Sequence, residues 1–284
     1  MEGLARAKVT LALDVLGPAQ DGFHPVNIVL HRIPVGDSIC VLPDPARLEM
    51  DGVPMEADNL CRRALALIEE VVGEKPAVGL RVTKRIPPGA GLGGGSADAA
   101  FVLHWAWSRY PERRAALAEA AVRLGMDVPF LLEGYEAARA TARGERLEPL
   151  PPLGGGWLVL AYPGWPVATA AVYAAYDRVG SPEPPRADAV VDALRHGVIP
   201  SELGNQLERA AWAVAPALAD FRRLLERAGA PPRRTALSGS GSTYLALFDD
   251  PEAARALAGR LVAEGVPWVR CFKLGGADGK GADR

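Results

Sequence analysis

The first residues of the chain alternate between apolar and polar positions. Within residues 7–15, every second side chain from Val9 onward is apolar, and Lys8 falls on the opposite face. A period of two is typical of a β-strand with one buried face. Further apolar runs at 26–33 and 37–42 predict two more strands. The chain is therefore expected to begin as a β-rich meander.

A helical period follows. Across residues 59–72, apolar side chains recur at the three-and-four spacing of an amphipathic helix, with Asp58 as the expected cap and Gly73 at the end. The remaining predicted elements are a strand over 78–82, helices over 96–109 and 111–125, a strand over 157–162, helices over 187–196 and 201–228, a strand over 244–248 and a helix over 251–265.

The composition shifts to turn-forming residues near the middle of the chain. Pro151 and Pro152 precede three successive glycines at 154–156. Such a cluster is typical of a loop between structural units. We therefore predict two domains, residues 1–152 and residues 153–284. The small, charged tail from residue 275 is expected to fray.

The overall composition excludes several classes of protein. Hydrophobic residues make up 49% of the chain and charged residues 23%, which excludes disordered, collagen-like and coiled-coil chains. A net charge of −2 gives no general field for nucleic acid, so we expect no such partner. No apolar run approaches 18 residues and no signal peptide is recognisable, which predicts a cytoplasmic protein without a membrane segment. Cys40, Cys61 and Cys271 lack metal-ligand spacing and are expected to be reduced thiols.

Five of the eight residues from Gly89 to Ser96 are glycine, and a predicted helix follows directly. The backbone amides of such a loop and the positive end of a helix can converge on a phosphate. The run fits the pattern GxGxxG, but the strand and acidic residue of a dinucleotide fold do not follow it. Gly95 stands where a P-loop has its lysine. A flexible linker is the alternative, which the abrupt entry into an apolar helix disfavours.

Asp127 and Lys8 are candidates for proton and charge chemistry. Asp127 follows a predicted helix, in the segment Met126–Pro129 that we expect as an ordered loop. A carboxylate held there can accept a hydroxyl proton, and a turn-forming aspartate is the alternative. Lys8 is one of five lysines beside 27 arginines. It can be the buried partner of a carboxylate or an exposed strand residue.

Two further segments suit a substrate. Ser238 to Ser242 alternates serine and glycine before a strand, so it offers backbone donors to a phosphate or a second substrate, or forms a plain turn. Phe23 and His24 place two rings near a loop tip. They can enclose a base or pack in the core.

Together these motifs resemble those of the GHMP small-molecule kinase superfamily over nearly the whole chain. The matching stretches are residues 7–9, 21–24, 87–100, 124–130 and 237–241. The resemblance implies an α+β fold of two domains, an N-terminal ATP-binding domain and a C-terminal substrate-binding domain, with the active site in the interdomain cleft. It also implies ATP as the phosphate donor and Mg²⁺ to neutralise the β- and γ-phosphates, with the Ser96 hydroxyl as a metal ligand.

The same resemblance implies roles for individual residues. Asp127 would take the proton of the acceptor hydroxyl as general base, and Lys8 would interact with it and with the developing negative charge. The residues implied on the ATP side are Asn59, Lys84, Pro88, Gly89, Ala90, Gly91, Leu92, Gly93, Gly94, Gly95, Ser96 and Ala97. Those implied on the substrate side are Thr10, Phe23, His24, Thr169, Tyr173, Ser238, Gly239, Ser240 and Gly241. Thr10 and Gln206 stand where the family usually has asparagine and aspartate.

Within the family, Phe23 and His24 favour an acceptor alcohol that carries a cytidine diphosphate group. We expect this small molecule as the partner, with no nucleic acid or membrane, and the chain as a monomer or weak homodimer. Mevalonate, phosphomevalonate and homoserine are the alternative acceptors within the family. A non-catalytic nucleotide-binding protein is the alternative outside it, and the combination of Asp127 with Lys8 disfavours it.

Overall fold

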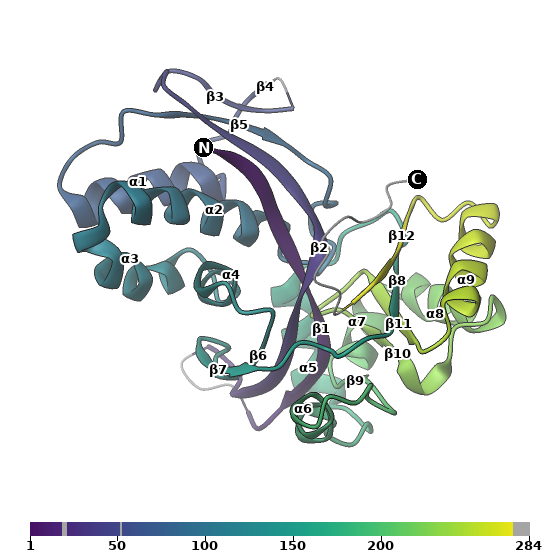
Figure 1. Cartoon of the computed structure of the whole chain (residues 1–284). Helices are drawn as coiled ribbons and strands as arrows, with labels where there is room; N and C mark the ends of the chain where they lie inside the picture. The colour runs from purple at the N-terminus through teal and green to yellow at the C-terminus, as the bar shows by residue number, and fades with distance from the viewer. Residues whose placement is uncertain (19–21, 52, 275–284) are drawn as a thin grey trace. The chain divides into compact units, whose positions relative to one another are not determined.

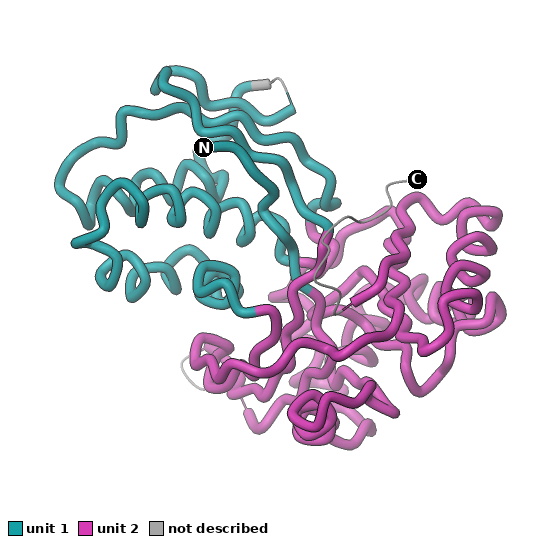
Figure 2. Tube along the Cα trace, in the orientation of Figure 1, with its two compact units in different colours: residues 1–8, 35–88, 93–135 teal, residues 9–34, 89–92, 136–284 magenta. Residues whose placement is uncertain are grey.

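The computed structural model describes residues 1–18, 22–51 and 53–274 (Figure 1). Helices and strands are mixed in two compact units (Figure 2). Unit 1 consists of residues 1–8, 35–88 and 93–135, and unit 2 of residues 9–34, 89–92 and 136 onward. These units do not follow the single boundary predicted between residues 152 and 153. The reason is that the two long N-terminal strands and the glycine-rich run contribute residues to both units.

The N-terminal strands are longer than predicted. β1 spans Glu2–Val15, and β2 spans Val26–Leu42, so the two strands expected at 26–33 and 37–42 are one. Pro34 does not interrupt β2 because the φ that its ring imposes is compatible with extended backbone. A Cβ on Gly36 would lie 2.1 Å from the carbonyl oxygen of Ala5. Glycine is therefore required at that point of unit 1.

Unit 1 combines short strands with a group of helices. β5 (Gly79–Thr83) pairs antiparallel with residues 38–42 of β2 and parallel with β3 (Leu48–Met50), which pairs with β4 (Val53–Pro54). The helices of this unit are α1 (Leu60–Val72), α2 (Gly94–Arg109), α3 (Arg114–Ala120) and α4 (Val128–Glu133). They lie together on one side of these strands, and α2 packs against both α1 and α4 (Figure 1).

Three predictions in unit 1 are corrected. Asn59, and not Asp58, caps α1, because its Oδ1 accepts a hydrogen bond from the amide of Cys61 at 2.8 Å. The helix predicted over 111–125 is α3 with a 3₁₀ turn on each side. The predicted loop at 126–129 is shorter, since α4 begins at Val128. Pro129 is tolerated in the first turn of this helix because amides there make no hydrogen bond within a helix.

Unit 2 contains a four-stranded antiparallel sheet in the order β10-β11-β8-β12. The strands are β8 (Trp157–Tyr162), β10 (Thr235–Leu237), β11 (Tyr244–Phe248) and β12 (Trp268–Lys273), and α9 (Pro251–Ala263) packs against three of them. The other elements are β6 (Ala137–Ala142), β7 (Arg146–Leu150), α5 (Thr169–Val179), α6 (Ala187–Arg195), β9 (Gly204–Asn205), α7 (Glu208–Val214) and α8 (Ala217–Arg227). A core around Val159, Leu207 and Leu257 joins the sheet to its helices.

The single helix predicted over 201–228 is wrong. The chain instead forms β9, α7 and α8, and Pro216 stands at the N-cap of α8. Proline lacks the amide that a continuous helix needs at that point, so α7 ends before it. β9 pairs with β1 through Ala12 and Gly204. The expected fraying of the tail concerns residues outside the described ranges. No helix in the described ranges has the length and apolar character needed to cross a membrane.

Candidate active site

Lys8 and Asp127 form an ion pair in unit 1. The Nζ atom of Lys8 lies 3.2 Å from Oδ2 of Asp127. The lysine side chain is only 5% exposed, whereas the aspartate side chain is 34% exposed. Burying an ammonium group is costly unless a partner compensates it. Lys8 is therefore the buried partner of a carboxylate, and the exposed-strand alternative is wrong.

Gly93 lies directly against this pair. A Cβ on Gly93 would come within 3.0 Å of Cε of Lys8 and 3.4 Å of Oδ2 of Asp127. Ser96, in the first turn of α2, brings its Oγ to 3.7 Å from the Cβ position of Gly125. The start of α2, the Ser96 hydroxyl and the segment that leads to Asp127 therefore lie close together in unit 1.

The glycine-rich run has the backbone geometry of an anion-binding loop. Gly89, Gly91 and Gly93 have φ values of 65°, 78° and 67°, so every second residue is left-handed. This alternation turns successive amides toward one side of a loop, where they can bind an anion. α2 begins at the next residue, two residues earlier than predicted. The local geometry agrees with the expected phosphate loop and disfavours a flexible linker.

In unit 2, the serine-glycine segment packs against residues 89–92. A Cβ on Gly91 would lie 2.2 Å from the carbonyl oxygen of Ser238. The Ser238 hydroxyl donates to the carbonyl of Gly91 at 3.0 Å and accepts from the amide of Thr10 at 3.2 Å. The amide of Thr243 donates to the carbonyl of Ala90 at 3.1 Å. The serine-glycine segment therefore holds the first half of the glycine loop through hydrogen bonds. The plain-turn alternative does not account for these contacts.

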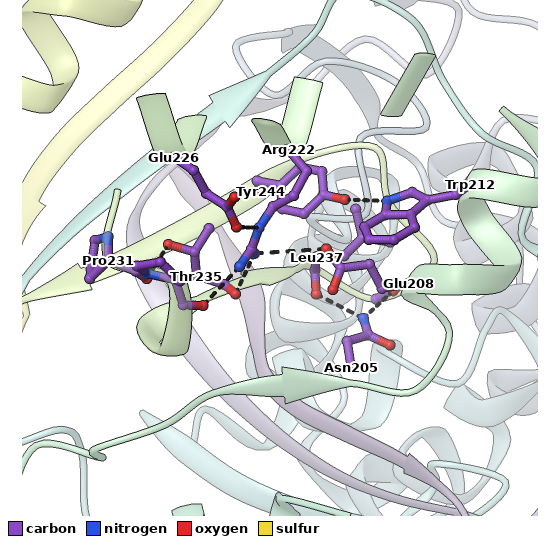
Figure 3. Close-up of polar contacts among 11 residues, drawn as sticks. Asn205, Glu208, Trp212, Arg222, Glu226, Pro231, Thr235, Leu237 and Tyr244 are labelled. Carbon is purple, nitrogen blue, oxygen red and sulfur yellow. Dashed lines mark hydrogen bonds and ion pairs between the residues drawn. The ribbon is translucent and has the colours of Figure 1, made fainter. Parts of the chain in front are cut away.

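Asn205 holds the same segment and was not among the predicted site residues. Its Nδ2 donates to the carbonyl oxygens of Leu237 at 2.8 Å and Gly239 at 2.6 Å. Figure 3 shows this asparagine beside a polar cluster that includes Glu208 and Tyr244. The family's usual asparagine is therefore present and structurally engaged. The departure at the next position, Gln206, leaves a side chain that bonds to the backbone of Val15 and Glu183.

The aromatic residues expected at the substrate differ in their surroundings. His24 is buried, stacks on Tyr173 with ring centroids 5.2 Å apart, and its Nε2 lies 2.7 Å from Oδ1 of Asp177. Phe23 is 43% exposed, with the guanidinium of Arg143 4.8 Å from the centre of its ring. Phe23 is therefore not a core residue, while His24 packs within unit 2. Thr169 and Ser240 meet through their hydroxyl oxygens, 2.7 Å apart.

Lys84 belongs to a buried cluster with two aspartates of unit 1 that sequence reasoning missed. Its Nζ contacts Oδ2 of Asp37 and lies 2.7 Å from Oδ2 of Asp98. Burial raises the pKa of the Asp98 carboxyl to about 7; the Lys84 ammonium opposes this shift and Asp37 adds to it. Burial alone would lower the pKa of Lys84, but the two carboxylates raise it above its usual value. The contact with ATP implied for Lys84 stays a prediction, as does that of Asn59, whose side chain caps α1.

The sequence holds only a weak signal for this cluster. Asp98 follows Ser96 by two residues in the expected phosphate motif, where an acidic residue on a predicted apolar helix stands out. Asp37 begins a predicted strand and carries no comparable signal. Their partnership with Lys84 depends on strand pairing and helix packing, which residue spacing does not reveal.

Residues 59–135 match the family described as the GHMP kinases N terminal domain, and residues 200–266 match the GHMP kinases C terminal family. The chain belongs to the GHMP kinases, and the expected fold is confirmed. Relatives named 4-diphosphocytidyl-2-C-methyl-D-erythritol kinase include one from Pelotomaculum thermopropionicum, 41% identical over 90% of this chain and 92% of that protein.

A second relative of that name, from Thermus thermophilus, is 38% identical over 98% of both chains. A crystal structure of 4-(cytidine 5'-diphospho)-2C-methyl-D-erythritol kinase is 37% identical, with a TM-score of 0.78, and covers 98% of this chain and 100% of that one. These relatives are named for a cytidine-bearing alcohol, which is the class of acceptor that Phe23 and His24 favour within the family. The two matched family domains fall on either side of the predicted boundary at residue 152.

Proposed function

We propose that this chain transfers the γ-phosphoryl group of ATP to the 2-hydroxyl of 4-diphosphocytidyl-2-C-methyl-D-erythritol, a step toward isoprenoid precursors by the non-mevalonate route. The observation that carries the proposal is the Lys8–Asp127 ion pair packed against Gly93 at the start of α2. Similarity to proteins of that name over nearly the whole chain supports the choice of substrate. The proposal assigns the two residues the roles that phosphoryl transfer requires.

Asp127 accepts the proton of the attacking hydroxyl in this proposal. Its carboxylate is one-third exposed, so a substrate can reach it, and Lys8 fixes its orientation from the buried side. A positioned general base contributes about 10²–10⁴-fold to rate. The Lys8 ammonium also offsets negative charge that develops during the transfer. Phosphoryl transfer depends mainly on positioning and charge stabilisation, so this small set of groups suffices.

The residues implied on the ATP side hold the nucleotide in this proposal. The left-handed glycines turn backbone amides toward the phosphates, and α2 adds the positive end of its dipole. Gly91 and Gly93 leave no room for side chains, so the backbone can approach an anion closely. The serine-glycine segment supports the loop through Ser238.

Mg²⁺ fits the residues present. Within the described residues, no group of three or more His, Cys, Asp or Glu side chains could hold a metal ion. Mg²⁺ in kinases is commonly held by nucleotide phosphates and only one or two protein oxygens. The Ser96 hydroxyl, in the first turn of α2, is an oxygen donor of the required kind. Bound there, Mg²⁺ would neutralise charge on the β- and γ-phosphates.

Phe23 is proposed to stack on the cytosine. Its exposed ring presents a flat apolar surface, as a base requires. His24 would contribute from a fixed orientation, since Tyr173 and Asp177 hold its ring. The hydroxyls of Thr169 and Ser240 would face the rest of the acceptor.

The test is acceptor-dependent release of ADP. The purified chain would receive ATP, Mg²⁺ and, separately, 4-diphosphocytidyl-2-C-methyl-D-erythritol, mevalonate, phosphomevalonate or homoserine. We expect ADP release with the cytidine-bearing alcohol alone, and ³¹P NMR of the product should show a phosphomonoester at the tertiary carbon. Asp127→Asn serves as the matched control. ADP release with another alcohol would contradict the substrate, and ATP binding without any acceptor-dependent ADP would indicate a nucleotide-binding protein.

A further inference from the structure

The cluster formed by Lys84, Asp37 and Asp98 joins two parts of unit 1 that flank the glycine loop. Lys84 follows β5 and precedes Pro88 by four positions, whereas Asp98 lies in α2, five residues after Gly93. The 2.7 Å contact between Lys84 and Asp98 therefore bridges the chain entering the loop and the helix leaving it. Both flanking segments belong to unit 1.

Asp37 fixes the entering segment from β2. Its Oδ1 accepts hydrogen bonds from the amides of Arg85 at 2.6 Å and Ile86 at 2.9 Å, while Oδ2 contacts Lys84. The same Oδ2 lies 3.4 Å from the Cβ position of Gly94, the first residue of α2. One carboxylate thus binds three successive residues before the loop and touches the start of the helix after it.

A gain in folding stability does not account for the buried charged groups of this cluster. Two carboxylates, at most 3% exposed, share one ammonium, so the interior of unit 1 holds either an excess negative charge or a carboxyl that keeps its proton. Asp98 Oδ1 has no hydrogen-bond partner among the described residues, which is an additional cost. Replacing buried ion clusters by well-packed apolar residues is often neutral or stabilising. Hydrogen bonds and ion pairs are directional, so these groups hold the two segments at specific distances and angles.

We propose that Asp37 and Asp98 are positioning residues, which act through Lys84 to hold the two ends of the glycine loop at the spacing that binds the phosphates of ATP. The inference rests on the proposed function, since it takes the loop as the ATP site. A loop held in its binding conformation avoids the entropic cost of ordering when the nucleotide arrives. Loss of the bridge should therefore weaken ATP binding and leave the affinity for the alcohol unchanged.

The variant that tests the bridge is Asp98→Ala. It removes the anchor on α2 but leaves the Lys84–Asp37 pair, so no unpaired buried charge results. Asp98→Asn keeps an oxygen that can accept from Lys84 and serves as the rescue variant. Glu70→Ala is the matched control, because it removes an ion pair of the same unit, with Arg123, that is exposed on both sides.

We expect Asp98→Ala to raise the Kd for the ATP analogue AMP-PNP, measured by calorimetry, and the KM for ATP about tenfold or more. The KM for the alcohol should not change. Asp98→Asn should stay within threefold of the parent for both quantities, and Glu70→Ala should match it. Hydrogen exchange should be faster at the amides of residues 93–97 in Asp98→Ala only.

A folded Asp98→Ala variant that melts at a lower temperature yet binds AMP-PNP within twofold of the parent would overturn the inference, since the cluster would then be merely structural. If Asp98→Ala does not fold, Asp98→Leu fills the same space with an apolar group and leaves Lys84 paired with Asp37. The same loss of AMP-PNP affinity is then expected, and parent-like affinity overturns the inference. Calorimetry needs no acceptor, so failure of the parent to phosphorylate any alcohol contradicts only the proposed function. Failure of the parent to bind AMP-PNP overturns both.

Discussion

The side chain of Lys8 occupies the space that a side chain on Gly93 would need. Its Cε and Cγ lie 3.0 Å and 3.2 Å from the Cβ position of Gly93, and the φ of that glycine is 67°. The lysine that neutralises Asp127 therefore also packs against the residue that caps α2. Lys8 therefore connects the proposed general base, Asp127, with the proposed phosphate loop at Gly93, all within unit 1.

Gly93→Val should abolish nucleotide binding. A β-branched residue strongly disfavours a positive φ, and its side chain would displace Lys8 from Asp127. Calorimetry with AMP-PNP would measure the loss. Gly259→Ala, on α9, is the control, because a Cβ at this position would have no atom of a neighbouring segment within 4 Å. Unchanged affinity in a folded Gly93→Val protein would show that the phosphates bind elsewhere.

Asp127→Asn should lower kcat by at least about 100-fold while the affinity for ATP stays nearly constant. The amide keeps the shape of the side chain but cannot accept the hydroxyl proton. Acceptor-dependent ADP release and AMP-PNP calorimetry would separate the two effects. More than about a tenth of parental kcat would correspond to a loss below ~1.4 kcal/mol and would rule out a general base.

Phe23→Ala should raise the KM for the cytidine-bearing alcohol roughly 5- to 150-fold, because stacking on a base contributes about 1–3 kcal/mol. The melting temperature should change little, since the ring is 43% exposed. Val262→Ala removes a side chain that is 63% exposed on α9 and serves as the control for thermal stability. A parental KM in the folded Phe23→Ala protein would contradict cytosine stacking.

Glu208→Gln should change how stability depends on pH. Burial raises the pKa of the Glu208 carboxyl above its ordinary value of 4.5, while Arg222 and the hydroxyl of Tyr244 oppose this shift (Figure 3). The folded state thus binds a proton more tightly than the unfolded state. The stability that this proton contributes is present at low pH and declines as pH rises above 4.5 through the raised pKa.

Relative to Glu208→Gln, the parent should therefore lose free energy of unfolding as pH rises through that window, by at most about 1.4 kcal/mol per pH unit. Urea denaturation of both proteins at several pH values would measure the difference. Asp220→Asn is the control, because its partner Arg223 and its own carboxylate are both mainly exposed. A difference between parent and Glu208→Gln that does not vary with pH would contradict the assignment.

Local features of the fold were predictable because they depend on neighbouring residues. The glycine run predicted a loop that enters a helix, since the left-handed backbone found at Gly89, Gly91 and Gly93 is adopted most readily by glycine. β8 and β11 have the predicted bounds, because short apolar runs between turn residues define them. Asp127 and Lys8 were candidates by residue type and by resemblance to the family, but nothing in their spacing indicated that they touch.

By itself, the sequence determined the periods of the strands and helices, the glycine loop and the kinase family. The tertiary structure alone decided which charged groups meet. Nothing in the sequence distinguishes Lys84 from an exposed lysine after a strand, yet strand pairing and the packing of α2 place it between Asp37 and Asp98. His24 and Phe23 are adjacent, yet one is buried against Tyr173 and the other is exposed. The physical reason is that period and φ are local properties, whereas burial and ion pairing depend on residues that are distant in the chain.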